Sequence, residues 1–215
     1  MLITVNGVAG TKKSVLAQLL SDDFQVPLLD EQAEVMQRFN QLCFSLHDLR
    51  DTKEVVSLTH FILQSQILNF KKGLNLSAEY NGSIVVSHPL AFWYTSIFPL
   101  YKENLFSRLE ALDYLEIIKE ANLPIASHQV NLILSPMAMA KRLEAQSSED
   151  QSLDTGFLKN SVLGFTHFAV EETRTNLKFS PTESIGIDTS NKIPPQIVSE
   201  LKDIDFFQQI ELAQM

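Results

Sequence analysis

Short runs of hydrophobic residues alternate along this chain with longer segments in which hydrophobic residues recur every three or four positions. Short runs that end at turn-forming residues predict buried strands, and the longer periodic segments predict amphipathic helices. The predicted strands span residues 2–6, 24–29, 83–87, 129–134 and 184–188. The predicted helices span residues 14–20, 33–47, 53–72, 103–121, 136 to about 145, about 156 to 176, and 194–213.

Strands and helices that alternate in this way are typical of a parallel sheet covered by helices on both faces. We therefore expect an α/β fold, with a three-layer α/β/α arrangement around a mostly parallel five-stranded sheet, in a single domain that spans residues 1–215. Ligands of such sheets bind beyond the carboxyl ends of the strands. Those ends carry residues 7–14, Asp30, Glu31, residues 87–88 and Ser135.

Local features add detail to these elements. The first helix is expected to bury one face, which carries Val15, Leu16, Leu19 and Leu20. Pro136 suits the first position of a helix, with Ser135 as its N-cap. Residues 146–155 are polar and predict a surface loop.

Composition and charge narrow the class of protein. Of the 215 residues, 45% are hydrophobic and 20% are charged, which supports a sizeable core and excludes disordered, collagen-like and coiled-coil chains. The one cysteine, Cys43, excludes a disulfide framework or a multi-cysteine zinc site and is expected to be buried in a helix. The net charge of −9 argues against binding to nucleic acid or to an anionic membrane. We see no targeting or membrane-spanning segment and expect a cytoplasmic protein.

The candidate chemistry begins in residues 7–14, Gly-Val-Ala-Gly-Thr-Lys-Lys-Ser, between the first predicted strand and helix. A P-loop has the pattern G-x-x-x-x-G-K-[ST]: main-chain N–H groups cradle phosphates, the lysine reaches the β and γ oxygens, and the hydroxyl binds Mg²⁺. Gly7, Lys13 and Ser14 match this pattern, whereas Lys12 replaces the second glycine. A left-handed backbone at Lys12 would cost about 1 kcal/mol or more. A strand–helix turn with two surface lysines is the alternative interpretation.

With three further segments, the chain resembles the deoxynucleoside kinase and thymidylate kinase group of P-loop kinases over residues 1 to about 190. Residues 7–14 are similar to the group's G-x-x-G-x-G-K-[ST], and residues 135–143 are similar to its S-P-E-x-A-x-x-R-I segment. Glu31, followed by Gln32 instead of proline, matches the glutamate that ends the group's second strand. The group's L-x-x-x-Y-L…Y helix is matched by Leu153, Phe157, Leu158 and Phe165.

This resemblance implies a P-loop kinase fold and ATP-dependent phosphoryl transfer, with Mg²⁺, to a nucleoside, a deoxynucleoside or a nucleoside monophosphate. It implies that Glu31 is the base that acts on the sugar hydroxyl, with Asp30 as a near alternative, and that Arg142 closes a lid of residues 141–155 over ATP. A homodimer through helix packing is also implied. The residues implied to bind the ATP phosphates are Gly7, Gly10, Thr11, Lys12, Lys13 and Ser14, and Ser14 is also implied to bind Mg²⁺.

Several positions depart from the group's pattern. After the third strand the group has an Asp/Glu-Arg pair that handles substrate and metal, whereas this chain has Ser87-His88. Lys12 could restore one positive charge near the phosphates, and His88 could do so only if it were protonated. Further departures are Gln146 and Ser148 in place of lid arginines, and Met137 in place of a carboxylate.

The nucleoside pocket is less defined by the motifs. Thr59 falls where the group has a glutamine that binds the substrate, and the nearby Gln64 and Gln66 leave that alignment open. The aromatic run at residues 92–94 would either pack in the core or stack on a nucleobase.

Two functions remain open. The retained Lys13, Ser14 and Glu31 favour an active, divergent kinase. The missing arginines favour a protein of kinase fold that has lost turnover and acts as a binding or assembly subunit with a protein partner, because one such arginine is worth about 10³–10⁵ in rate.

Overall fold

The computed structural model describes residues 1–31, 33–44, 52–124, 126–145, 155–171 and 183–203, and in these residues five strands pair in parallel in the order β2-β3-β1-β4-β5. The strands are β1 (Leu2–Gly7), β2 (Leu28–Leu29), β3 (Ser83–Val86), β4 (His128–Ile133) and β5 (Glu183–Asp188). The predicted five-stranded α/β fold is therefore confirmed.

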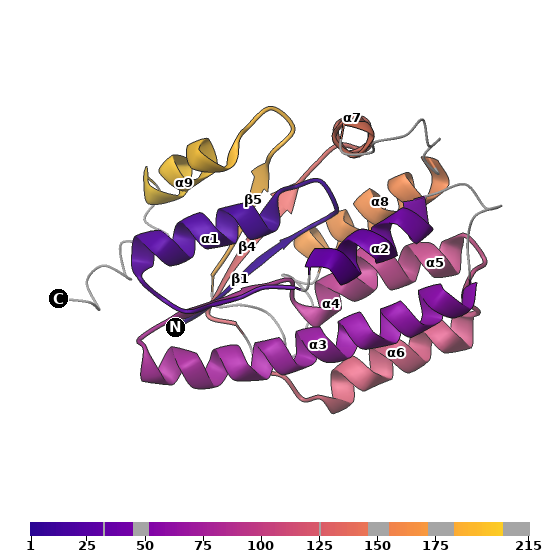
Figure 1. The fold of residues 1–215 in the computed structure, drawn as a ribbon, viewed down its shortest axis with the longest axis horizontal. Helices are drawn as coiled ribbons and strands as arrows, with labels where there is room; N and C mark the ends of the chain where they lie inside the picture. Colours follow the sequence, from indigo (N-terminus) through magenta and orange to yellow (C-terminus); the bar gives the residue numbers. More distant parts are fainter. Residues whose placement is uncertain (32, 45–51, 125, 146–154, 172–182, 204–215) are drawn as a thin grey trace.

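Helices cover both faces of the sheet (Figure 1). One face is covered by α1 (Lys13–Phe24) and α9 (Pro194–Asp203). The other face is covered by α2 (Ala33–Phe44), α3 (Thr52–Glu79), α4 (Pro89–Phe92), the π-helix η2 (Trp93–Ile97), α5 (Phe98–Lys102), α6 (Arg108–Glu120) and α8 (Thr155–Glu171). A further helix, α7 (Pro136–Glu144), follows β4.

Two hydrophobic cores hold these layers together. Alternate side chains of a strand point to opposite faces of the sheet, so Ile3 and Val5 of β1 join Leu16 of α1 in one core. Leu2 of the same strand joins Phe70 of α3 in the other core. Burial on both faces explains why the strands appear in the sequence as short, nearly continuous hydrophobic runs.

The first helix and the second strand differ in detail from their predictions. Val15 is 51% exposed, although the pattern placed it on the buried face, because Leu16 and not Val15 faces the sheet. The predicted strand over residues 24–29 shrinks to β2, since Phe24 still belongs to α1 and Pro27 has no N–H to donate to a neighbouring strand.

Other local predictions are confirmed or corrected. The Ser135 hydroxyl accepts a hydrogen bond from the Ala138 N–H at 3.2 Å, as expected of an N-cap, and Cys43 is buried on α2. The segment predicted as helical from residue 103 begins only at α6, where Ser107 and Glu110 form a capping box. Residues 89–102 form three short helices that the pattern did not predict.

Some predictions fall outside the described residues: most of the loop at 146–155, and the helices beyond residues 171 and 203. Within the described ranges, no helix is both long and apolar enough to span a membrane.

The loop between β1 and α1 adopts the backbone shape that a P-loop glycine would favour, although a lysine occupies the position. Lys12 is the N-cap residue of α1 and has left-handed dihedral angles, with φ 60° and ψ 35°. An L-residue in this conformation is strained by about 1–2 kcal/mol. The surrounding fold therefore holds the loop in shape against this local cost.

A buried polar contact fixes the turn after β3. The Asn6 side-chain oxygen, at the end of β1, accepts a hydrogen bond from the His88 N–H at 2.7 Å. His88 Nδ1 in turn accepts from the Leu90 N–H at 3.1 Å and caps α4, while its ring lies edge-on to Phe70. Burial lowers the pKa of His88 to about 4, so the ring is neutral at pH 7 and cannot supply a positive charge near the phosphates.

We predict that the free energy of unfolding of the Lys12→Gly variant is about 1 kcal/mol higher than that of the Lys12→Ala variant. Both variants lose the ammonium group, but only glycine adopts the left-handed conformation without strain, and this gain exceeds its entropic cost in the unfolded chain. Urea unfolding of the two variants would test the prediction. Equal stabilities would show that residue 12 does not hold this conformation in solution.

We predict that His88 makes the protein acid-sensitive. The pKa of His88 is about 4 in the folded state and near 6.5 in the unfolded state. Between these values the unfolded chain binds the extra proton, so the unfolding free energy should fall as the pH drops from 6.5 to 4, by on the order of 3 kcal/mol.

The matched variant is His88→Asn, which keeps an N-cap acceptor but does not titrate. The unfolding free energies of both proteins would be compared at pH 7, 5.5 and 4.5. A pH dependence that is the same in both proteins would contradict the prediction.

Candidate active site at the carboxyl ends of the strands

The loop at residues 7–14 presents the start of α1 to the carboxyl edge of the sheet. Gly7 must be glycine, because a Cβ there would lie 2.5 Å from Thr11 Oγ1. Thr11 closes the loop on itself through a hydrogen bond from its hydroxyl to the Val8 carbonyl at 2.8 Å. The first turn of α1 carries no acidic residue, and its N-cap Lys12 makes no side-chain capping bond. The helix itself thus brings no acidic side chain to its N-terminus, although the carboxylates of Asp30 and Glu31 contact Ser14 and Lys13 in its first turn.

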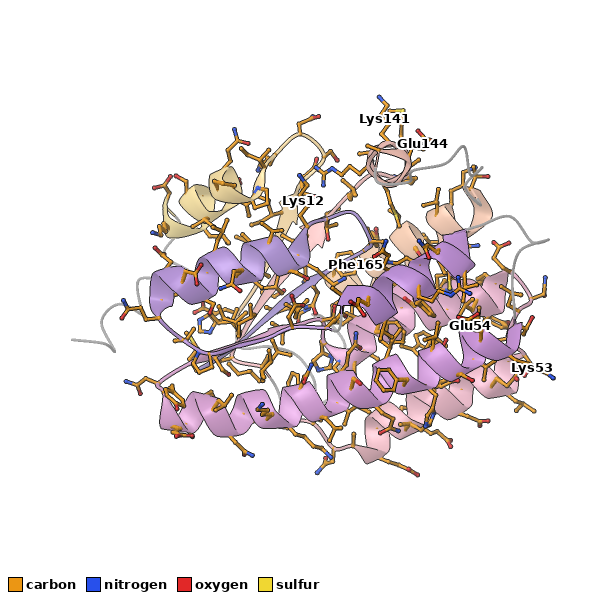
Figure 2. All side chains as sticks on the ribbon, viewed as in Figure 1. Lys12, Lys53, Glu54, Lys141, Glu144 and Phe165 are labelled. Atoms are coloured by element: carbon orange, nitrogen blue, oxygen red, sulfur yellow. The ribbon has the colours of Figure 1, made fainter. Side chains whose placement is uncertain are left out.

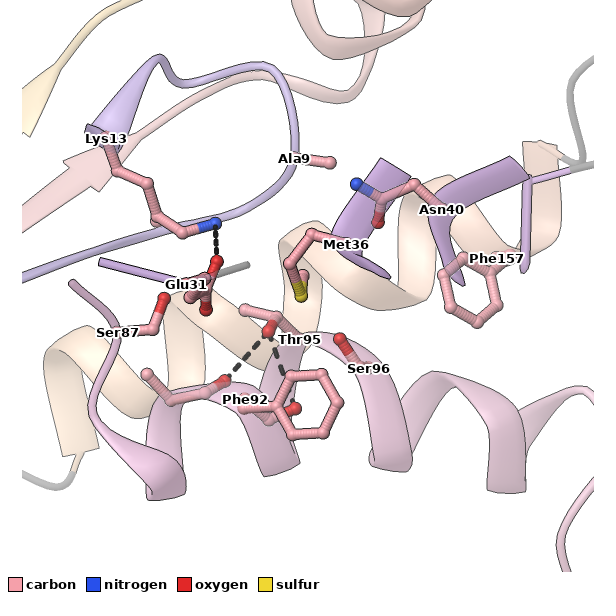
Figure 3. A pocket seen from close by; sticks show the side chains of 12 residues that line it. Ala9, Lys13, Glu31, Met36, Asn40, Ser87, Phe92, Thr95, Ser96 and Phe157 are labelled. Carbon is pink, nitrogen blue, oxygen red and sulfur yellow. Dashed lines mark hydrogen bonds and ion pairs between the residues drawn. The ribbon is translucent and has the colours of Figure 1, made fainter. Parts of the chain in front are cut away.

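Lys13 and Glu31 form the centre of the site. Lys13 Nζ lies 3.4 Å from Glu31 Oε2, and the two side chains are 15% and 7% exposed (Figure 3). The pair joins the loop after β1 to the end of β2. The structure therefore brings together the lysine implied to bind phosphates and the glutamate implied to act as base.

Gln66 on α3 holds the other oxygen of this carboxylate. Its Nε2 donates to Glu31 Oε1 at 2.6 Å. Gln66 is 1% exposed, and its own Oε1 has no hydrogen-bond partner within the described part of the chain. Gln66 and Glu31 also line a second cavity of about 240 Å³ between α2 and α3. Both oxygens of Glu31 are thus engaged, which fixes the direction of the carboxylate.

A cavity of about 430 Å³, open to solvent, extends from this ion pair between the loop, α2, α4, η2 and α8 (Figure 3). Hydrophobic side chains of Met36, Phe92 and Phe157 form part of its wall. Polar groups also face it: Asn40, Ser87, Thr95 and Ser96. This mixture suits a flat, mostly apolar ring with polar edges.

The wall at η2 depends on a close approach of α8. The Thr95 carbonyl accepts a hydrogen bond from the Ser161 hydroxyl at 2.6 Å. A Cβ on Gly164 would lie 2.0 Å from the Tyr94 carbonyl oxygen, so only glycine fits. A π-helix frees carbonyl groups from their usual partners, and such segments are frequent at functional sites.

The three aromatic side chains at residues 92–94 have different surroundings: two contact other helices, and one lines the cavity. Trp93 donates from Nε1 to the Ala111 carbonyl at 2.8 Å, and the Tyr94 ring lies 6.0 Å from Phe168. These contacts hold the Trp93 and Tyr94 side chains against α6 and α8. Phe92 alone of the three lines the cavity.

Ser14 and Asp30 lie together beside the ion pair. The Ser14 hydroxyl donates to Asp30 Oδ1 at 3.1 Å, and the same oxygen accepts from the Glu31 N–H at 2.7 Å. Burial raises the pKa of the Asp30 carboxyl above its usual value, against the lowering effect of these two hydrogen bonds. No group of three or more His, Cys, Asp or Glu side chains is placed for a metal ion among the residues with described positions. Mg²⁺ needs only one or two protein carboxylates together with phosphate oxygens, so the donors here suit it.

Arg142 and Lys12 lie away from the ion pair. The Arg142 guanidinium donates to the Gly10 carbonyl at 2.9 Å and to the Thr189 carbonyl, and thus joins α7 to the loop and to the turn after β5. Lys12 is exposed at the start of α1 (Figure 2). Neither residue lines the 430 Å³ cavity. The catalytic role implied for Arg142 and the phosphate contact implied for Lys12 stay predictions.

Of the three residues on the long helix that the alignment left open, the structure places one beside Glu31. Thr59 is buried and donates to the Val55 carbonyl at 2.7 Å, and Gln64 is exposed. Gln66 is the glutamine beside Glu31. The sequence signal for Gln66 was only its nearness to Thr59, the position that the resemblance to the kinase group indicated. Asn40 and Ser96 carried no signal, because only the packing of α2, η2 and α8 turns them toward one cavity.

Comparison with solved structures shows likeness to deoxyadenosine kinase from M. mycoides. The structure with bound dATP matches with a TM-score of 0.68 and 16% sequence identity over 94% of this chain and 98% of that chain. The structures with bound dCTP, and with the products dCMP and a flexible dCDP, each match with a TM-score of 0.69 and 16% identity over 95% of this chain and 100% of theirs. No family model and no curated protein matches the sequence. The chain thus has the fold of a deoxynucleoside kinase, as its motifs indicated.

Proposed function

We propose that this protein is a divergent nucleoside kinase, which transfers the γ-phosphoryl group of ATP to the hydroxyl group of a nucleoside or deoxynucleoside. One observation carries the proposal: the 3.4 Å contact between Lys13 Nζ and Glu31 Oε2, two residues that line the 430 Å³ cavity. The solved structures of the same fold with bound dATP, dCTP and dCMP support a nucleotide-handling role.

Lys13 and Glu31 suit the two sides of such a reaction. Phosphoryl transfer depends mainly on positioning and on charge compensation at the transferred group. Lys13 extends from the loop whose main-chain amides would receive the donor phosphates. When a phosphate oxygen of ATP replaces Glu31 as the ion-pair partner of Lys13, the Glu31 carboxylate becomes available as a base toward the cavity.

The reaction follows from this arrangement. The acceptor oxygen forms a bond to the γ-phosphorus, while the bond from that phosphorus to the β–γ bridging oxygen breaks and ADP leaves. The hydroxyl proton passes to the Glu31 carboxylate. Gln66 keeps the carboxylate directed toward the cavity through its 2.6 Å hydrogen bond. Mg²⁺, bound at Ser14, would neutralise charge on the phosphates.

The lining of the cavity favours a nucleoside over a nucleoside monophosphate as acceptor. A monophosphate needs cationic groups in addition to those that hold the donor. Lys13 is the only cation among the described residues that line the cavity. The hydrophobic wall near Met36 and Phe92 suits a nucleobase, and the amide of Asn40 can both donate and accept hydrogen bonds at its edge.

A second candidate function is supported by the turn after β3. Ser87 presents only a hydroxyl to the cavity, and His88 is buried and neutral. Charge compensation at the γ-phosphoryl group is therefore weaker than in a kinase with an acid–arginine pair. On this observation the alternative is a catalytically inactive protein of kinase fold that binds a protein partner.

We predict that Glu31→Gln lowers phosphoryl transfer by about 10²–10⁴-fold and leaves the fold intact, because the amide keeps the shape of the side chain but cannot accept the proton. Purified protein would be assayed with ATP against a panel of nucleosides, deoxynucleosides and nucleoside monophosphates. Lys13→Ala is expected to lose ATP affinity as well.

The matched control is Glu34→Gln, which makes the same change at an exposed position on α2 and should retain wild-type turnover. Wild-type protein that forms no more product than Glu31→Gln with any acceptor would reject the kinase and leave the inactive binding protein as the function. Capture of a stable protein partner would then support that second candidate.

We predict that Gln66→Leu lowers kcat by about 10–100-fold. Without the hydrogen bond from Gln66, the Glu31 carboxylate is no longer held in one position, and a displacement of about 1 Å is enough to slow the reaction strongly. ATP affinity should stay within about twofold. The unfolding free energy should change by no more than about 1 kcal/mol, since loss of the hydrogen bond to Glu31 is offset by removal of the unpartnered buried carbonyl.

Gln64→Leu, on the exposed face of the same helix, is the control for Gln66→Leu. A fall in stability together with an unchanged kcat would show that Gln66 is a structural residue and does not position the base.

A further inference from the structure

The end of β3 leaves the metal of a phosphoryl-transfer site without a carboxylate. Mg²⁺ in such sites is usually held by one or two protein carboxylates together with phosphate oxygens and water. Ser14 offers a hydroxyl, and Ser87 offers a second hydroxyl. Neither brings negative charge. A carboxylate from another element is needed if the site is to hold MgATP.

Asp30 brings a carboxylate to that place from a different strand. It follows β2, which is separated from β1 by β3 in the sheet, yet its Oδ1 lies 3.1 Å from Ser14 Oγ at the start of α1. The side chain therefore reaches past the end of β3. Ser87, which follows that strand, is small and lines the same cavity as Lys13 and Glu31.

We propose that Asp30 and Ser14 together are the protein ligands of the magnesium ion that accompanies the nucleoside triphosphate. The inference rests on the proposed use of ATP. The carboxylate that binds the metal would then follow β2, and not β3 as in the kinase group that the sequence resembles. The two adjacent acids would have different roles, since Asp30 would bind the metal and Glu31 would act on the acceptor.

The contacts of the two acids support this division. Both oxygens of Glu31 are engaged, one by Lys13 and one by Gln66. Asp30 makes its two side-chain hydrogen bonds through Oδ1 alone, and in the described part of the structure its Oδ2 has no hydrogen-bond partner. An oxygen with free lone pairs beside a hydroxyl is the donor set that a hard cation prefers.

The spacing of the donors also fits the ion. Adjacent ligands of an octahedral cation with bonds of 2.0–2.1 Å lie about 2.9 Å apart. Ser14 Oγ and Asp30 Oδ1 are 3.1 Å apart already. The Glu31 N–H holds Asp30 Oδ1 in place at 2.7 Å, so the carboxylate is positioned before any ligand binds.

Charge gives the proposal a distinctive consequence. Without a divalent cation, Asp30 would repel the triphosphate, whereas with the cation it would attract the complex. Asp30→Asn should therefore strengthen the binding of ATP in the absence of Mg²⁺, by about fivefold for one charge removed at close range. The same variant should weaken the gain in ATP affinity that Mg²⁺ provides, by about 10-fold or more.

The experiment is a calorimetric titration of ATP into the full chain, once with excess Mg²⁺ and once with a chelator. The wild type, Asp30→Asn and the control Asp113→Asn, an exposed acid on α6, would be compared. The asparagine oxygen can still accept the bonds from Ser14 and Glu31, so the fold should persist, as circular dichroism would verify.

We expect Mg²⁺ to strengthen ATP binding to the wild type and to Asp113→Asn by the same factor, and by a factor about 10-fold or more smaller for Asp30→Asn. An equal effect of Mg²⁺ on all three proteins would overturn the role of Asp30 and leave the proposed kinase intact. Loss of ATP binding to Asp30→Asn in both conditions would also overturn it. Absence of ATP binding to the wild type, with or without Mg²⁺, would overturn the proposed function and this inference with it.

Discussion

The ion pair between Lys13 and Glu31 is the contact on which the candidate site depends. It joins the loop after β1 to the end of β2, two segments that are not neighbours in the sheet. They meet because all five strands described are parallel, so their carboxyl ends lie at one edge. The small residue Ser87 follows β3, and both side chains reach past it. The topology of the sheet thus creates the site before any ligand binds.

The loop at residues 7–14 keeps its shape without the glycine that usually permits a left-handed backbone. Lys12 holds a left-handed backbone at a local cost, and Arg142 ties the neighbouring Gly10 carbonyl to the turn after β5. The tertiary structure supports a conformation that the local sequence disfavours. Strain of this kind persists where the surroundings over-determine the backbone.

Charge compensation decides between an active kinase and an inactive binding protein. The cation at the centre of the site is Lys13, since Lys12 is exposed and His88 is buried and neutral. A site with few cations depends more on its metal ion, which makes the placement of Asp30 beside Ser14 important. In this arrangement the metal, and not an arginine, would offset most of the negative charge on the transferred group.

Much of the fold could be predicted because hydrophobic periodicity reports burial directly. The strands, the helices α2 and α3, and the N-cap at Ser135 all follow from patterns within a few residues. Val15 was misplaced because a pattern shows which helical face is apolar but not how the helix is rotated against the sheet. Residues 89–102 were missed because a π-helix depends on a distant segment: Ser161 and Gly164 of α8 stabilise it.

The sequence by itself determined the alternation of strands and helices, the position of the loop at residues 7–14, and the presence of Lys13, Ser14, Asp30 and Glu31 at strand ends, because these features depend on near neighbours in the chain. Only the tertiary structure decided how these side chains are paired. Gln66 reaches Glu31 across 35 positions, and Asp30 reaches Ser14 across 16. Such contacts form only when the sheet and its helices have packed, so no local pattern encodes them.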